Sequence, residues 1–148
     1  MPHFTLQISQ QGPIVQAAIM VTLARREVLE SSGLAVPDPQ RISALIDTGA
    51  SISGVDPSVL SALNLSATGE VEVHTPSTAG NPVPSSTFDV QIGIYAGRPG
   101  DLHFISETIQ VISPILSNQG FHALIGRDIL KSCIFHYNGS DELFTLAY

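Results

Sequence analysis

The sequence predicts a mostly β domain with two or three short helices, and three observations support this fold class. Short apolar segments alternate with polar residues at a period of two, as half-buried strands do. Ten prolines and twelve glycines are spread along the 148 residues and divide the chain into short segments joined by turns. The length is that of one ordinary domain, and 43% of the residues are apolar, which is enough for a hydrophobic core.

The first half of the chain is expected to hold three strands and two helices. Helical spacing predicts a helix over Arg25–Ser32, which ends at Gly33, a favoured C-cap. Asp56 followed by Pro57 is typical of a helix start, so a second helix is expected to run to about Asn64. The strands are expected at Phe4–Ser9, Ile14–Leu23 and Ile42–Ile46.

The second half is expected to hold two hairpins. Val71 and Val73 alternate with charged residues, and Thr87–Tyr95 alternates again. The Pro- and Ser-rich segment Thr75–Ser86 lies between them and predicts a long hairpin with an exposed tip. The remaining predicted elements are strands at Phe104–Ile112 and Ala123–Ile125, a helix over Arg127–Ser132, and the C-terminal hairpin strands Cys133–Tyr137 and Leu143–Tyr148.

The composition argues against several kinds of partner and site. Six basic residues against thirteen acidic ones give a net charge of −7, which disfavours binding to a phosphate backbone. The single cysteine, Cys133, excludes an internal disulfide, and no two of the five histidines have the short spacing of metal ligands. The apolar stretch Pro13–Ala24 is too short for a membrane span and lacks the charged start of a signal peptide. We therefore expect a soluble, cytoplasmic protein with no metal, no cofactor, and no nucleic-acid or membrane partner.

The strongest chemical signal is an acidic turn that follows the buried strand Ile42–Ile46. Asp47-Thr48-Gly49 would carry a carboxylate to the edge of the core, where Thr48 could lock the turn and Gly49 would let another backbone approach. An acid held in a rigid loop at the end of a strand is a catalytic arrangement. The alternative is an Asp in an ordinary surface turn, because Asp and Gly are common in turns.

Two motifs together resemble the retropepsin-like aspartic proteases. Ala44-Leu45-Ile46-Asp47-Thr48-Gly49-Ala50-Ser51 resembles the active-site motif of that family. Ala123-Leu124-Ile125-Gly126-Arg127-Asp128-Ile129-Leu130 resembles its second signature, which opens the C-terminal helix. The resemblance covers about Ile14–Tyr148. It implies one domain over 1–148 with a single-lobe acid-protease fold, a flap hairpin at about 70–94 and a helix-bearing insertion at about 24–40.

The resemblance implies a role for each matching residue. Asp47 would be the catalytic carboxylate, Thr48 would hydrogen-bond across a subunit interface, and Gly49 would leave room for the substrate backbone. Ala50 and Ser51 would line the cleft and bind substrate. Further substrate contacts would come from the flap residues Thr75, Pro76, Ser77 and Thr78, and structural support for the active loop from Ile125, Gly126, Arg127 and Asp128.

Three features differ from the retroviral members of this family. Position 51 is Ser, where the viral enzymes often have an acid that pairs with the Arg of the second motif, so Arg127 needs another partner. The insertion at about 24–40 is unlike the compact viral enzymes. The flap carries Pro76, Pro82 and Pro84, where the viral flaps are glycine-rich.

The mechanism of this family requires two aspartates, and the chain has one Asp-Thr-Gly. Two carboxyl groups about 3 Å apart share one proton and titrate as a pair. The second aspartate must then come from a second copy on a two-fold axis. The resemblance thus implies an aspartic endopeptidase that acts as a homodimer on a peptide or protein substrate. The alternative is a module of the same fold that dimerises or binds peptides with little or no proteolytic activity.

Two properties of the chain are compatible with such a dimer. Only 13% of the residues are charged, about half the usual share, so part of the surface is expected to be covered by a partner. The C-terminal hairpin is strongly apolar, and its side chains fit either a subunit interface or an ordinary core. The residues in question are Ile134, Phe135, Tyr137, Leu143, Phe144, Leu146 and Tyr148.

Overall fold

Alternating apolar residues make β-strands the main regular structure of the chain, as the sequence predicts. The computed structural model describes residues 1–75, 79–97 and 104–148. Its helices are α1 Leu23–Ser31, α2 Pro57–Ala62 and α3 Arg127–Leu130, with a short 3₁₀ turn, η2, at Ser117–Gln119. Its strands are β1 His3–Gln7, β2 Ile14–Met20, β3 Gln40–Ile46, β4 Gly54–Val55, β5 Gly69–Val73, β6 Val83–Tyr95, β7 Phe104–Ile105, β8 Ile109–Ile112, β9 Ala123–Ile125, β10 Ile134–Asn138 and β11 Leu143–Ala147.

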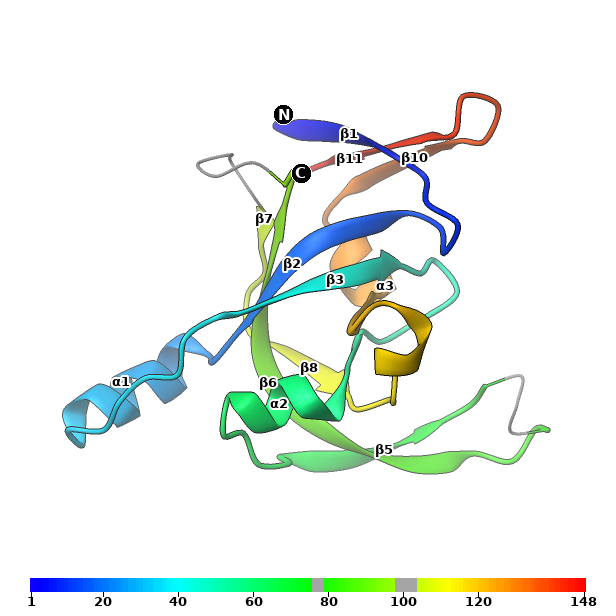
Figure 1. Ribbon diagram of the computed structural model, residues 1–148. Helices are drawn as coiled ribbons and strands as arrows, with labels where there is room; N and C mark the ends of the chain where they lie inside the picture. The colour runs from blue at the N-terminus through cyan, green and yellow to red at the C-terminus, as the bar shows by residue number, and fades with distance from the viewer. Residues whose placement is uncertain (76–78, 98–103) are drawn as a thin grey trace.

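The larger sheet closes on itself into a small barrel (Figure 1). Its strands follow the order β2-β3-β9-β4-β8-β6, and β6 pairs again with β2. The long strand β6 makes this closure possible because it pairs with β5 and β2 along one edge and with β8 and β7 along the other. Alternate side chains of these strands point into the barrel and form the core, with Val15, Ile19, Val90, Ile92 and Ile125 almost completely buried.

A second, three-stranded sheet contains both ends of the chain in the order β1-β11-β10 (Figure 1). The predicted C-terminal hairpin is confirmed, with Ile134 opposite Ala147 in its register. Phe144 and Leu146 of β11 are completely buried and belong to the core. On β10, Ile134 and Tyr137 remain 59% and 55% exposed. The apolar residues of this hairpin are therefore divided between the core and the surface.

Several predicted elements have different bounds in the structure. The predicted strand Ile14–Leu23 ends at Met20, because the side chain of Thr22 caps α1 by accepting a hydrogen bond from the Arg25 amide at 3.1 Å. The predicted strand Phe104–Ile112 is divided into β7 and β8, whose registers along β6 differ by one residue. Ser106 lies at the break, where its Oγ accepts the hydrogen bond of the Ile92 amide at 2.9 Å.

The long hairpin consists of β5 and β6, with Gly69 opposite Thr87 and Val73 opposite Val83. The second strand begins at Val83, so the prediction of a loop as far as Ser86 is wrong. Pro84 is tolerated there because this part of β6 pairs along one edge only, and a proline has no amide hydrogen to offer at the other. Residues 76–78 of the tip lie outside the described residues.

The helix α1 projects from the barrel as an arm (Figure 1). Among the described residues, the helices are all too short or too polar to cross a membrane.

Candidate active site

The acidic turn begins where β3 ends, and β9 fixes its position. Ile46 of β3 lies beside Ile125 of β9 in a parallel ladder, and both side chains are buried. The amide of Asp47 continues this ladder by donating to the Ile125 carbonyl at 2.9 Å. The main chain of Asp47 is therefore anchored to the core at the point where its side chain leaves it.

The side chain of Asp47 closes a tight turn. Its Oδ1 accepts a hydrogen bond from the Gly49 amide at 2.8 Å, and its carbonyl oxygen accepts one from the Ala50 amide at 3.2 Å. A Cβ on Gly49 would lie only 3.1 Å from this Oδ1, so glycine gives the turn its close fit. The half-buried carboxylate is thus held in one orientation, with one of its two oxygens engaged by the turn.

The second motif contacts this turn from the other side. The Arg127 amide donates to the Ala50 carbonyl at 2.9 Å, and its Nη1 donates to the Thr48 carbonyl at 3.3 Å. Gly126 has no space for a side chain, since a Cβ would lie 3.0 Å from the carbonyl oxygen of Ala50 and from the carbonyl carbon of Ile52. The partner that Arg127 requires is therefore the backbone of the turn.

Asp128 ties the same region together through Ser53, which the sequence motifs do not include. The Ser53 amide donates to Asp128 Oδ2 at 2.9 Å, and the Ser53 hydroxyl donates to Asp128 Oδ1 at 2.6 Å. The hydroxyl also accepts from the Gly126 amide at 2.9 Å. Ser53 is completely buried, so this network fixes the chain just after the acidic turn.

The predicted substrate-binding residues fall into two groups. Ala50 and Ser51 belong to the acidic turn, together with Thr48 and Gly49. Of these four residues, Thr48, Gly49 and Ser51 are exposed. Thr75 is exposed just beyond β5 on the long hairpin. The other three predicted contacts, Pro76, Ser77 and Thr78, lie outside the described residues.

Comparison with known proteins relates the fold, and only the fold, to one class. No family model and no curated protein matches the chain. A solved structure described as a retropepsin-like aspartic protease from Rickettsia conorii is similar over 99% of this chain and 91% of its own, with a TM-score of 0.58. The chain has a single-lobe retropepsin-like fold. At 16% sequence identity, the likeness extends to the architecture and the placement of its elements.

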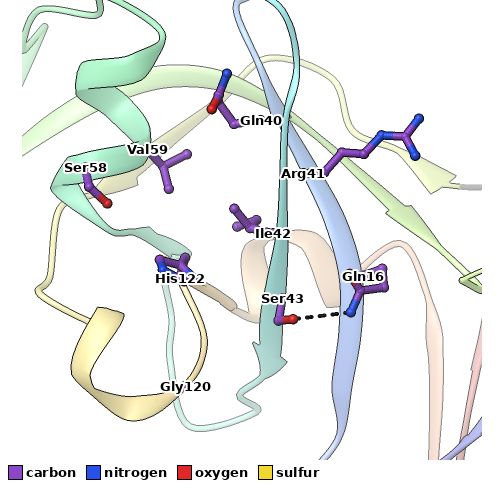
Figure 2. A pocket seen from close by; sticks show the side chains of 9 residues that line it. All are labelled: Gln16, Gln40, Arg41, Ile42, Ser43, Ser58, Val59, Gly120 and His122. Atoms are coloured by element: carbon purple, nitrogen blue, oxygen red, sulfur yellow. Dashed lines mark hydrogen bonds between the residues drawn. The ribbon is translucent and has the colours of Figure 1, made fainter.

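Within this retropepsin-like fold, a pocket of about 440 Å³ lies away from the acidic turn, along the part of β3 that β9 does not cover. Figure 2 shows the side chains around it, among them Gln16, whose Nε2 donates to Ser43 Oγ at 3.2 Å. The guanidinium of Arg41 is also engaged, since it lies 5.8 Å from the ring centroid of Tyr95. None of the described residues lining this pocket is an acid, so paired-carboxylate chemistry cannot take place there.

Other reactive groups are poorly placed for catalysis. Among residues 1–75, 79–97 and 104–148, no group of His, Cys, Asp and Glu side chains could hold a metal ion. Cys133 is half-buried beside α3, and burial raises the pKa of its thiol, which keeps it protonated and unreactive.

Proposed function

We propose that this chain is an aspartic endopeptidase that acts as a homodimer, in which each subunit contributes one Asp47. The observation that carries this proposal is the construction of the acidic turn. Gly49 orients the Asp47 carboxylate, β9 anchors the main chain of Asp47, and Arg127 donates to the carbonyl groups of the turn that follows it. Such rigid support for an accessible carboxylate is what general acid–base catalysis needs.

A single chain supplies half of the required site. Thr48, Gly49 and Ser51 are exposed beside Asp47, so this loop presents a surface that a second copy could cover. Figure 1 supports one side of the molecule for this contact: the end of β3, the end of β5, the start of β6 and the β10–β11 turn all lie on its right-hand side. A two-fold axis there would bring the two Asp47 carboxyl groups together.

The paired carboxyl groups would divide the work of hydrolysis. One, ionised, takes a proton from a water molecule as the water oxygen attacks the peptide carbonyl carbon. The other, protonated, donates its proton to the carbonyl oxygen, and the tetrahedral intermediate then collapses with protonation of the leaving amine. The β5–β6 hairpin would act as the flap and would pair with the extended substrate as an added strand.

Incubation with a mixed peptide library, comparing the wild type with Asp47→Asn, tests this function. We expect cleavage products with the wild type alone. A wild-type protein that binds peptides without cleaving them would instead support the non-enzymatic module of the same fold.

The dimer is expected to weaken when the exposed apolar surface of β10 is charged. We infer that Tyr137, which the core leaves 55% exposed beside the β10–β11 turn, belongs to the interface. Tyr137→Lys should raise the dimer dissociation constant by a factor of about ten or more, as loss of a buried apolar anchor does. Sedimentation velocity over a concentration series measures it. The matched control is Leu34→Lys, because Leu34 is similarly exposed, at 60%, in the segment just after α1. Equal dimerisation of both variants would exclude β10 from the interface.

Cleavage is expected to be fastest at acidic to mildly acidic pH. A carboxyl pair works only while it holds one proton, and repulsion between two close carboxylates keeps that proton bound to higher pH than in an isolated acid. The rate should therefore fall toward neutral pH as the shared proton is lost. A profile of kcat/KM against pH measures this. A rate that rises steadily from about pH 6 to about pH 9 would contradict a carboxyl pair and indicate a different nucleophile.

A further inference from the structure

A second pocket, of about 310 Å³, lies at the base of the β5–β6 hairpin. Figure 1 shows the loop after α2 that leads into β5 at this point. Three segments far apart in sequence form it: the first turn of α1, residues 64–68 of the loop, and β6. Asp47 is not among its lining residues, so it is separate from the candidate active site.

Two opposite charges face this pocket. Arg25 comes from α1 and Asp89 from β6, and Asp89 is half-buried. In the part of the chain that the structure describes, neither side chain has a salt bridge or a hydrogen bond. Opposite charges on the walls of one pocket that do not pair leave room between them for a molecule that carries both complementary charges.

The rest of the lining can hydrogen-bond to such a molecule. Asn64, Ser66 and Thr68 contribute an amide and two hydroxyl groups to the pocket. Asn64 has a φ of 52°, in the left-handed region that Asn adopts more readily than most residues, so the loop is turned sharply at this point. Leu65 contributes an apolar, half-buried wall beside these polar groups.

We propose that this pocket binds a free α-amino acid. The planar guanidinium of Arg25 would hold the carboxylate through two parallel hydrogen bonds, and the carboxylate of Asp89 would hold the ammonium group. The volume lies at the lower end of the range for small-molecule sites, which favours a ligand of this size. Neither a simple anion nor a simple cation satisfies both walls.

The pocket is joined directly to the hairpin. The Thr68 amide donates to the Thr87 carbonyl at 2.8 Å, and β5 begins at the next residue, Gly69. Thr87 is completely buried, and its Oγ1 is a buried polar atom without a hydrogen-bond partner among the described residues. The base of the hairpin therefore contains a buried hydroxyl group whose hydrogen-bonding capacity is not used. A ligand that links α1, the loop and β6 would make the base of the hairpin more rigid. This second step rests on the proposed function, in which the hairpin is the flap, and predicts that the amino acid changes the cleavage rate.

Titration of the whole chain with L-leucine and glycine, followed by amide chemical shifts, tests the binding. N-acetyl-L-leucine lacks the positive charge and L-leucinamide lacks the negative one. We expect saturable shifts at the pocket residues with the two free amino acids and not with the two blocked compounds. Arg25→Gln and Asp89→Asn should each weaken binding by a factor of about ten or more. The matched control, Arg26→Gln, changes the neighbouring residue on α1, which is outside the pocket lining, and should bind as the wild type does.

Two results would overturn the binding proposal: no saturable shifts at millimolar amino acid, or equal binding of the free and blocked compounds. The binding test does not depend on catalysis, so it separates this proposal from the proposed function. Cleavage measured with and without L-leucine then tests the coupling. A rate that changes in the wild type and not in Arg25→Gln supports regulation from this pocket, and an unchanged rate despite binding excludes it.

Discussion

Asp47→Asn is expected to abolish peptide cleavage and to leave the fold intact. The asparagine side chain has nearly the same shape, and its carbonyl oxygen can still accept the hydrogen bond from the Gly49 amide. In a homodimer this one substitution removes both catalytic acids. We therefore expect kcat/KM to fall by a factor of about 10⁴ or more, while the free energy of unfolding stays within about 0.5 kcal/mol of the wild type.

The control for this prediction is a second Asp→Asn change that removes the same charge elsewhere. Asp38 is exposed between α1 and β3, so Asp38→Asn should cleave as the wild type does. Both variants are compared with the wild type by the release of peptides from a mixed library and by urea denaturation. Wild-type cleavage by a folded Asp47→Asn protein would show that Asp47 is not the catalytic acid.

The local patterns in the sequence predict much of the fold, because strand alternation and helix capping depend on residues that are close together in the chain. Alternation at a period of two identifies the strands that bury one face, and the Asp-Pro pair at Asp56 and Pro57 identifies the start of α2. The acidic turn is predictable for the same reason. Asp47 bonds within its own turn to Gly49, two residues away, so its geometry depends on neighbouring residues that the sequence shows directly.

The support around that turn is not predictable in the same way, because it joins residues distant in the chain. Ser53 and Asp128 are 75 residues apart, and their pairing depends on how β9 and α3 dock. The partner of the Arg127 guanidinium is the carbonyl oxygen of Thr48, a backbone atom that every residue type has. A search for an acidic side chain at position 51 could not find it.

Short elements and exceptions to propensity account for the remaining differences. The strand β4, Gly54–Val55, is only two residues long, and its pairing with β9 and β8 determines it. The beginning of β6 contains Pro84, which disfavours a strand in general but not where one edge is unpaired. In both cases the tertiary arrangement decides the structure, and local propensity is too weak to oppose it.

Asp56 is the residue whose loss is expected to destabilise the fold most. Its side chain is buried and caps α2, accepting hydrogen bonds from the Ser58 amide at 3.0 Å and the Ser58 hydroxyl at 2.6 Å. Its other oxygen accepts from the amides of Leu116 and Ser117, both at 2.8 Å. One carboxylate thus joins the start of α2 to the loop before β9, which leads to the second motif.

Asp56→Ala leaves these donors without a partner, and the Leu116 amide is buried. We expect the free energy of unfolding to fall by about 3–5 kcal/mol, because buried donors lose their hydrogen bonds and α2 loses its cap. Such a loss is a large fraction of the stability of a domain of this size. Asp56→Asn keeps one acceptor oxygen and should lose less, so it provides a folded variant if the alanine protein does not fold.

The stabilisation by Asp56 should also depend on pH, in a direction that the hydrogen bonds determine. Burial by itself would raise the pKa of this carboxyl group, but the four hydrogen bonds to its charged form outweigh burial and hold the pKa well below its usual range. The folded pKa is therefore below the unfolded one, so the stabilisation is complete above the unfolded pKa, about 4, and is lost as the pH falls below it. Urea denaturation from neutral pH to about pH 3 should show the difference in unfolding free energy between wild type and Asp56→Asn narrowing on acidification. A difference that stays constant over this range would mean that the carboxylate charge does not contribute to the fold, and that the hydrogen bonds act as they would for a neutral cap.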